Sequence, residues 1–212
     1  MGPRDRRERD RAELREKILD ATRELFAEYG YEGVSMRKIA ERIEYSPTSI
    51  YLHFADKETL FRELCYGDFR LLSKEFAVMA ETADPAERLR QIGEAYVRFG
   101  ASHPSHYRMM FMTPPPIKSC DTAYEAEAKG KPESDADAFL RWTVNQAMDA
   151  GLLREDLVDI ELVSQTLWAA VHGVTSLEIA LHGDHWLPWR PLEDRTRAML
   201  DVIMNGLARK ES

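Results

Sequence analysis

The stretch from Ser35 to Lys57 constrains the fold more than any other, because it encodes two short helices joined by a tight turn. In the first helix, apolar residues recur at the spacing of one helix face: Met36, Ile39, Ala40 and Ile43. Ser35 and Ser46 precede the two helices, where a hydroxyl caps free N–H groups, and Pro47 suits a first helical position. Two short helices with an apolar seam and a polar outer face predict a helix-turn-helix, whose second helix enters a DNA major groove.

A longer pattern surrounds these helices. Residues 39–60 read I-A-E-R-x-x-x-S-x-x-x-x-Y-x-H-F-x-x-K-E-x-L, and residues 25–35 read L-F-A-E-Y-G-Y-E-G-V-S. Together they resemble the DNA-binding signature of the tetracycline-repressor (TetR) family, over roughly the first third of the chain. The resemblance implies an all-α fold, in which a three-helix helix-turn-helix DNA-binding domain precedes a helical ligand-binding and dimerisation domain.

The resemblance also implies a function and a set of DNA-binding residues. The expected protein is a ligand-responsive transcriptional repressor that binds a pseudo-palindromic, double-stranded DNA operator as a homodimer. Thr48, Ser49 and Pro47 would read base edges, while Tyr51, His53 and Lys57 would hold phosphates. The complete set is Ser35, Arg37, Lys38, Ser46, Pro47, Thr48, Ser49, Tyr51, His53 and Lys57. Since a cation is mildly unfavourable at a helix start, Lys57 suggests a phosphate contact; the alternative is a solvated lysine.

The chain departs from the family pattern at two places. Glu44 stands in the turn where the family usually has Gly, so a non-glycine residue is expected at positive φ, at a cost of about 1 kcal/mol. Thr48-Ser49 replaces the frequent Gly-Thr at the base-reading positions. The operator sequence therefore cannot be transferred from relatives.

Charge and helix signals divide the chain into three parts: residues 1–11 as a flexible arm, 12–58 as the DNA-binding domain, and 59–212 as the ligand-binding and dimerisation domain. The arm carries five arginines among three acidic residues, which predicts either a disordered arm or the fraying start of a helix. A basic arm that reaches a minor groove is the functional alternative. The net charge of −8 resides mainly beyond residue 60, because the first 60 residues hold 12 Lys/Arg and 13 Asp/Glu. A nearly neutral DNA-binding domain joined to an acidic remainder of the chain favours specific over non-specific DNA binding.

Cap residues and 3.6-residue periodicity place the remaining helices. They are expected over 13–29, from Lys57 to about Thr82, and onward from Asp84, Pro104, Asp135, Asp159 and Pro191. A loop is expected over 113–134, partly helical near Tyr124. The last two helices have more apolar surface than one subunit can cover, which predicts a homodimer through both of them.

The second half of the chain suggests an effector site. Trp168-Ala-Ala-Val-His172-Gly173 resembles the W-x-x-x-H-G motif of one C-terminal class of the same family. Residues four apart share a helix face, so this pair could present an apolar wall and a hydrogen-bonding group to a small, largely apolar effector. The expected lining is Tyr96, Phe99, Tyr107, Met110, Trp142, Trp168 and His172. The alternative for each is an ordinary core residue.

Several functional classes are excluded or left as alternatives. There is no G-x-S-x-G, H-E-x-x-H, G-x-G-x-x-G or phosphate-loop pattern, so neither an enzyme nor a cofactor is expected. His182-x-x-His185 could be a fragment of a metal site but reads better as solvated, and no metal is expected. No long apolar run or signal peptide occurs, and Cys65 and Cys120 read as reduced thiols, which predicts a cytoplasmic protein that does not enter a membrane. An activator, a ligand-independent DNA-binding protein and a helical module for a protein partner remain alternatives.

Overall fold

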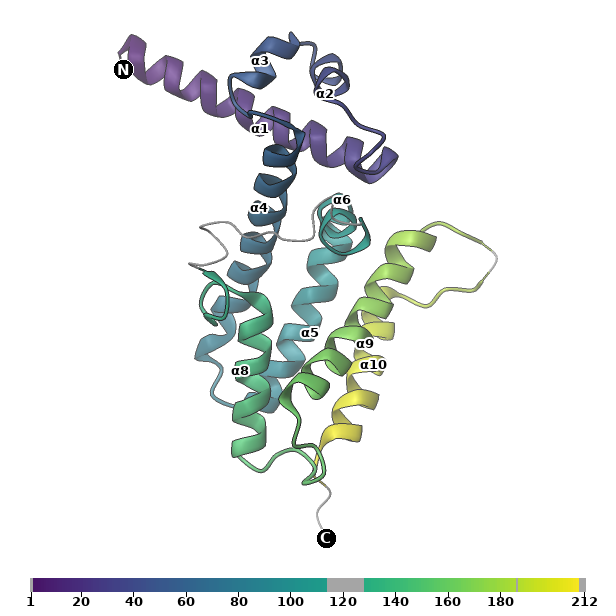
Figure 1. Cartoon of the computed structure of the whole chain (residues 1–212). Helices are drawn as coiled ribbons and strands as arrows, with labels where there is room; N and C mark the ends of the chain where they lie inside the picture. The colour runs from purple at the N-terminus through teal and green to yellow at the C-terminus, as the bar shows by residue number, and fades with distance from the viewer. Residues whose placement is uncertain (1, 114–127, 186, 210–212) are drawn as a thin grey trace. The chain divides into compact units, whose positions relative to one another are not determined.

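The computed structural model describes residues 2–113, 128–185 and 187–209, and these residues form helices joined by short turns (Figure 1). The first helices are α1 (Pro3–Tyr29), α2 (Met36–Arg42), α3 (Pro47–Tyr51), α4 (Lys57–Ala77) and the 3-10 turn η1 (Val78–Glu81). They are followed by α5 (Pro85–Ser102), α6 (Pro104–Tyr107), the π-helical segment η2 (Arg108–Met112), α8 (Ala136–Asp149), α9 (Ile160–Leu181) and α10 (Leu192–Leu207). No strand occurs in these ranges, which confirms the all-α prediction. Among the helices described, none is both long and apolar enough to cross a membrane.

Helix starts lie where the cap residues predicted them. The side chains of Asp84, Asp135 and Asp159 each accept hydrogen bonds from the backbone at the start of α5, α8 and α9. The Asp56 carboxylate accepts a 2.7 Å bond from the Thr59 amide at the start of α4. These carboxylates satisfy donors that a helix start otherwise leaves free. The expected helical turn near Tyr124 and the thiol of Cys120 lie outside the described residues.

Helix α1 differs from the prediction at its beginning. It starts at Pro3 rather than near Glu13, so of the two expectations for the first residues the helix start is the one observed. Proline is favoured at a first helical position, and the Gly2 amide donates a 2.9 Å hydrogen bond to the Asp5 carboxylate. The charges that suggested disorder alternate in sign, which lets opposite charges fall three or four residues apart on a helix.

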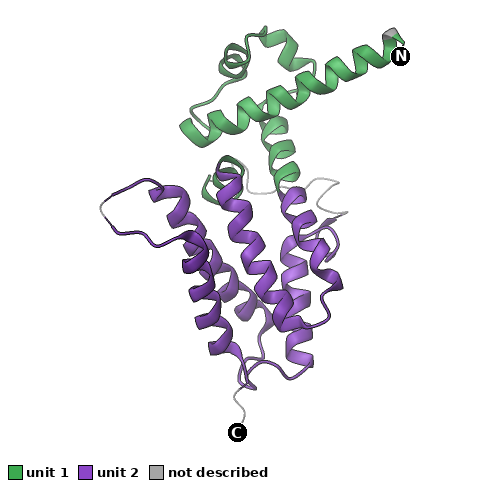
Figure 2. Ribbon diagram, turned by 180° about the vertical axis from the view of Figure 1, so that it is seen from behind, with its two compact units in different colours: residues 1–68, 105–122 green, residues 69–104, 123–212 purple. Residues whose placement is uncertain are grey.

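The chain folds into two compact units, coloured separately in Figure 2. Unit 1 comprises residues 1–68 and 105–122, and unit 2 comprises 69–104 and 123–212. The boundary expected after residue 58 is therefore revised in two ways: it lies within α4, and a later segment returns to unit 1. The physical reason is that Leu60, Leu64 and Met109 are buried in the core of unit 1.

The core of unit 1 is apolar and joins α1, α2, α3 and the first half of α4. Its most deeply buried members include Ile18, Leu25, Phe26, Ile39, Ile50, Phe54, Leu60, Phe61, Leu64 and Met109. Phe26 and Phe61 pack with ring centroids 5.7 Å apart, and both contact the ring of Tyr31. This core stabilises the short helices α2 and α3, because isolated helices of seven and five residues are not stable in water.

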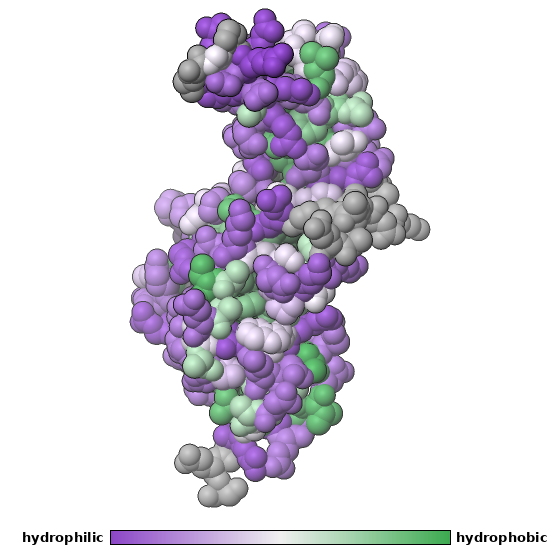
Figure 3. All heavy atoms as spheres, turned by 90° about the vertical axis from the view of Figure 1, so that its left-hand side faces the viewer, coloured by the Kyte–Doolittle hydropathy of each residue, from purple (hydrophilic) through white to green (hydrophobic). Residues whose placement is uncertain are grey.

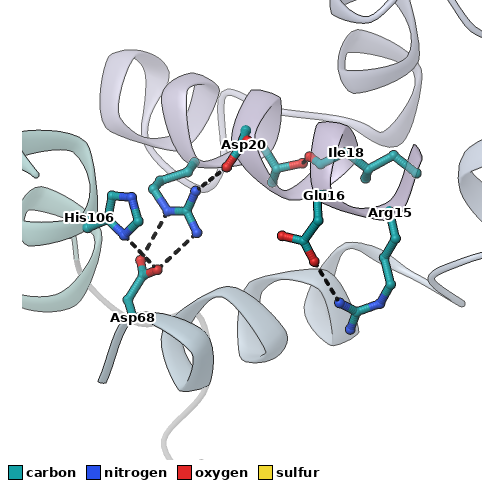
Figure 4. A network of polar contacts seen from close by, with 8 residues as sticks. Arg15, Glu16, Ile18, Asp20, Asp68 and His106 are labelled. Atoms are coloured by element: carbon teal, nitrogen blue, oxygen red, sulfur yellow. Dashed lines mark hydrogen bonds and ion pairs between the residues drawn. The ribbon is translucent and has the colours of Figure 1, made fainter. Parts of the chain in front are cut away.

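A buried ion cluster adds a polar connection within unit 1 (Figure 4). Asp68 of α4 is 1% exposed, and its two carboxylate oxygens accept hydrogen bonds of 3.2 and 2.9 Å from the guanidinium of Arg23 on α1. Nδ1 of His106 lies 2.9 Å from the same carboxylate, while Asp20 contacts the guanidinium at 2.8 Å. The cluster therefore links α1, α4 and α6, and its two buried members, Arg23 and Asp68, would each be costly to leave unpaired.

In unit 2, α9 packs against α5, α8 and α10. An apolar core lies between them, with members that include Leu89, Val144, Ala147, Val163, Leu167, Met204 and Leu207. Gly93 on α5 permits a close approach to α10, because a Cβ at this position would lie 2.6 Å from Cδ2 of Leu200. Arg88 is also buried: its guanidinium donates to the carbonyl of Thr82 and lies 4.6 Å from the ring of Trp142 on α8.

Candidate functional site

The helix-turn-helix is built by caps on the outside and apolar contacts on the inside. Oγ of Ser35 accepts a hydrogen bond of 3.2 Å from the amide of Lys38, and Oγ of Ser46 accepts one of 3.2 Å from the amide of Ser49. Met36, Ile39, Ala40 and Ile50 face the core and are buried. With the apolar side fixed in this way, the opposite side of α3 has no role in packing and is available for a ligand.

The turn between α2 and α3 places Glu44 at φ 59°. This confirms the expectation that a residue other than glycine adopts positive φ here, and it is the one such residue among those the structure describes. The conformation lets the Tyr45 amide donate a 2.9 Å hydrogen bond to the carbonyl of Ala40, which closes the end of α2. Left-handed backbone is unfavourable for a residue with a Cβ, so the turn stores strain.

The expected base-reading residues differ in how available they are. Pro47 and Thr48 are exposed, whereas Ser49 is half-buried and its hydroxyl lies 2.9 Å from that of Ser46. Two further residues next to α3, not expected from the sequence, are exposed: Tyr45 before α3 and Leu52 after it. Neither residue falls at the spacing of the buried apolar residues in the adjoining helix, and this departure could have predicted that both side chains are exposed.

The expected phosphate-binding residues Tyr51, His53 and Lys57 lie between the end of α3 and the start of α4. Tyr51 is exposed, and His53 is half-buried. Burial, assisted by the positive charges of Arg11 and Arg15, lowers the pKa of His53. His53 therefore favours the neutral form, which can donate one hydrogen bond to a phosphate but supplies no charge.

Lysine and arginine side chains near α2 have partners within the protein. Arg37 is exposed and forms a 2.8 Å ion pair with Glu41. Nζ of Lys38 lies 3.1 Å from the centroid of the Tyr29 ring. Both pairs lie at the surface, where an ion pair or a cation–π contact is worth about 1 kcal/mol or less, so phosphates could displace them.

Lys57 has a structural role that the sequence did not suggest. Its ammonium group donates hydrogen bonds of 3.0 Å to the carbonyl oxygens of Tyr31 and Val34, and lies 4.0 Å from the centroid of the Tyr31 ring. These contacts explain a cation in the first turn of α4, because it satisfies carbonyls of the α1–α2 turn. An ammonium has three donors, so one N–H remains for the predicted phosphate contact.

In unit 2, the structure brings together three of the residues expected to bind an effector. Nε1 of Trp168 donates a hydrogen bond of 2.9 Å to the hydroxyl of Tyr96, which lies 3.3 Å from Nδ1 of His172. Tyr96 is buried on α5, whereas 43% of the surface of Trp168 on α9 is exposed. Burial lowers the pKa of His172, so the neutral imidazole is favoured. The group combines an accessible apolar ring with polar atoms that already have partners.

The other four expected residues lie elsewhere. Phe99 is buried on α5, where its ring stacks on that of His103 at 5.1 Å. Trp142 is half-buried on α8, 5.4 Å from the ring of Phe139. Tyr107 and Met110 belong to unit 1. The structure thus does not gather all seven residues into one described unit.

A surface pocket of about 460 Å³ occurs at the C-terminal end of α9. Its lining includes Leu177, Glu178, His182, Trp189 and Arg195, and none of the seven expected residues contributes to it. His182 lies 2.9 Å from the carboxylate of Glu178, which agrees with an ordinary polar contact. No cluster of three or more His, Cys, Asp or Glu with metal-site geometry occurs in the described part of the chain.

Family models match both parts of the chain. One, for bacterial regulatory proteins of the tetR family, matches residues 18–64, which contain the helix-turn-helix. The other, described as a tetracyclin repressor-like C-terminal domain, matches residues 89–203. The second match alone covers more than half of the chain.

Curated relatives agree with these matches. The transcriptional repressor AcnR of Corynebacterium efficiens is 31% identical over 164 residues, which span 76% of this chain and 80% of that protein. AcnR of Corynebacterium diphtheriae is 44% identical over 54 residues, 26% of this chain and only 28% of that protein. The transcriptional activator FasR of Mycolicibacterium smegmatis is 27% identical over 188 residues, 84% of this chain and 83% of that protein.

Solved structures show the same fold. A TetR family transcription regulator from Marinobacter aquaeolei superimposes with a TM-score of 0.74 at 19% identity, over 96% of this chain and 100% of the other. The TetR family regulator PfmR from Thermus thermophilus superimposes with a TM-score of 0.68 at 27% identity, over 91% of this chain and 99% of the other.

Proposed function

Because this chain belongs to the TetR family of transcriptional regulators, we propose that it is a repressor that binds a pseudo-palindromic operator as a homodimer and is released by a small, largely apolar effector. The observation that carries the proposal is the outer face of α3, whose exposed Pro47, Thr48 and Tyr51 serve no packing role. A helix with one side anchored in a core and the other side open suits major-groove reading.

Within this proposal, the DNA contacts divide by chemistry. Thr48, Ser49 and Pro47 read base edges, and Tyr51, His53 and Lys57 hold phosphates. Further phosphate contacts come from the start of α2, through Ser35, Arg37 and Lys38. Ser46, the cap residue of α3, also contacts the DNA. The exposure of Thr48 supports its role directly, whereas Ser49 must first exchange its contact with the Ser46 hydroxyl for one with a base.

The test is footprinting of the DNA upstream of the chain's own gene, followed by affinity measurements on the protected sequence. Thr48→Ala should change the preference at one or two base positions by about 1–3 kcal/mol. Glu75→Ala, an exposed change on the part of α4 that belongs to unit 2, is the control and should leave the ranking of operator variants unaltered. The base-reading role is refuted if Thr48→Ala also preserves that ranking.

Repression rather than activation is supported by AcnR of Corynebacterium efficiens, a relative that is named a repressor and matches over 80% of its length. FasR, named an activator, favours the second candidate function. Deletion of the gene distinguishes them: transcription of the gene beside the footprint should rise for a repressor and fall for an activator.

The homodimer is supported by an uncovered apolar face on α9 and α10. Leu162, Ala169, Gly173 and Ala180 fall on one side of α9, and Leu162 is 59% exposed. Val202 on α10 is 76% exposed. Small residues at this spacing permit two helices to approach closely, and such a face is costly to leave in water.

Light scattering tests the dimer. The wild-type protein should have twice the 24.4 kDa mass of one chain, and Val202→Glu should reduce it toward that of the monomer. Val158→Glu is the matched control, because Val158 is 82% exposed but lies outside α9 and α10. Equal masses for both variants would place the interface elsewhere.

For the effector, we propose that Trp168, Tyr96 and His172 form the polar side of an otherwise apolar site within unit 2. Native mass spectrometry of the purified protein should reveal a retained small molecule. Trp168→Phe keeps an aromatic ring but removes the N–H that donates to Tyr96. It should weaken effector release of the operator while operator affinity without effector stays the same.

A further inference from the structure

The N-terminal third of α1 extends beyond the core of unit 1. Every described side chain from Arg4 to Glu13 is exposed, yet the helix is continuous from Pro3. At a rise of 1.5 Å per residue, the distance along the axis from Arg4 to Arg15 is about 16 Å. A helix segment that extends this far without packing partners is exposed to solvent on all sides. The N-terminal end of the molecule, at the top of Figure 3, is mostly hydrophilic on the face shown.

Arginines on this extension share one face. Arg4, Arg7 and Arg11 recur at spacings of three and four, and the same repeat continues through Leu14 and Ile18 into the core. The three arginines, which we call the arginine stripe, therefore occupy the face that buries apolar side chains further along α1. None of the three forms an ion pair with any residue in the described ranges.

Acidic residues on the extension lie off this face. At 100° per residue, Glu8 and Asp10 flank the stripe on its two sides, while Asp5 and Glu13 point away from it. The two remaining arginines, Arg6 and Arg9, also point away and mix with these acidic residues. Charge is thus segregated: one face is positive, although the first 60 residues as a whole are nearly neutral.

The stripe points toward the side of α1 that carries α3. Arg15, one turn beyond Arg11 on the same face, places its guanidinium 5.2 Å from the centroid of the Phe54 ring, just after α3. The positive charges of Arg11 and Arg15 both act on His53 at the end of α3. In Figures 1 and 2, the N-terminal end of α1 runs past α3.

We propose that Arg4, Arg7 and Arg11 bind the phosphates of the DNA that flanks each half-site. The inference rests on the proposed operator binding by α3 and extends it outward. A row of arginines that form no ion pair within the described ranges, beside α3, matches a row of phosphates. Arginine binds phosphate oxygens with paired N–H groups. Since base pairs are 3.4 Å apart, 16 Å of helix reaches at most about five base pairs beyond the half-site.

The salt dependence of operator binding tests the proposal. The stripe variant, Arg4→Gln with Arg7→Gln and Arg11→Gln, is compared with a control variant that loses the same charge from other faces of α1: Arg6→Gln with Arg9→Gln and Lys17→Gln. Each lost phosphate contact reduces the slope of log K against log salt by about 0.9, so six contacts in a dimer reduce it by about 5. The control should change the slope by less than about 1.

Trimming the DNA supplies a second readout. When five base pairs are removed outside each half-site, the wild-type protein and the control variant should lose affinity, whereas the stripe variant should bind both duplexes equally. Glu8→Gln, which removes an acidic residue beside the stripe, should bind the long duplex more tightly than the wild type. This single exposed change keeps the test valid if the triple variant folds poorly.

The outcomes separate this inference from the proposed function. A protected operator with equal salt slopes for the stripe and control variants would overturn the stripe and leave operator binding intact. The same conclusion would follow if the wild type, the control variant and the stripe variant lost equal affinity when the flanking base pairs are removed. Absence of any protected site would overturn both proposals together.

Discussion

Replacing Glu44 with glycine should stabilise unit 1 by about 0.5–1 kcal/mol. Glu44 holds φ 59° in the turn between α2 and α3, where a left-handed conformation costs a residue with a Cβ about 1–2 kcal/mol. Glycine removes this cost, but it also makes the unfolded chain more flexible, which lowers the free energy of unfolding by about 0.4–1 kcal/mol. The net gain corresponds to a roughly three-fold change in the folding equilibrium.

Hydrogen exchange at the amide of Tyr45 measures this effect locally, because that amide donates to the carbonyl of Ala40 across the turn. Slower exchange in Glu44→Gly, together with a higher urea midpoint, is the expected result. Glu44→Asn should give an intermediate gain, because asparagine tolerates positive φ better than other residues with a Cβ.

Glu44→Gln separates strain from charge. It removes the carboxylate but keeps the strained backbone, so it should leave stability close to that of the wild type. All three variants should raise operator affinity by a similar factor at low salt, since each removes the same negative charge beside the proposed DNA face. If Glu44→Gln stabilises the protein as much as Glu44→Gly does, backbone strain is not the cause and the reasoning is refuted.

Three further changes probe the interior. Asp68→Asn should cost about 3–5 kcal/mol in urea unfolding, because it leaves its buried arginine partner uncompensated, whereas the exposed Asp20→Asn should cost less than about 1 kcal/mol. Gly93→Ala should lower stability by about 1–2 kcal/mol and reduce the melting temperature, since the clash of the new Cβ with the Leu200 side chain outweighs the better helix propensity of alanine; no loss would mean that the Leu200 side chain rotates aside at little cost. NMR titration should show that the pKa of His172 in the folded protein lies below its usual value of 6.5. Because the unfolded chain then binds the proton at a higher pH than the folded one, the free energy of unfolding should fall as the pH drops through 6.5. A pKa above 6.5 in the folded protein would contradict the effect of burial.

Helix starts were the most predictable part of the fold. Ser35, Ser46, Asp84, Asp135 and Asp159 each cap a helix as expected, because a cap depends on residues within three or four positions of one another. The positive φ at the turn was predictable for the same reason. Local chemistry determines these features, so a single sequence contains enough information to place them.

Features that depend on distant residues were not predictable. Lys57 donates to the carbonyls of Tyr31 and Val34, more than twenty positions earlier, and no local pattern indicates that pairing. Asp68 and His106 meet only because the segment after α5 returns to unit 1. The start of α1 stayed open between a disordered arm and a fraying helix start, because charged residues without apolar spacing give no periodic signal to choose between them.

The return of residues 105–112 to unit 1 bears on how this protein can be recombined with others. A fragment that ends at residue 68 would lack Met109, which is buried in the core of unit 1, and the partner that His106 provides to Asp68. Loss of a buried methionine alone costs about 2–5 kcal/mol. The DNA-binding unit therefore cannot be transferred to another protein as one continuous segment of the chain. A chimera with another regulator's effector domain must carry both segments, or supply a matching 105–112 segment from the recipient.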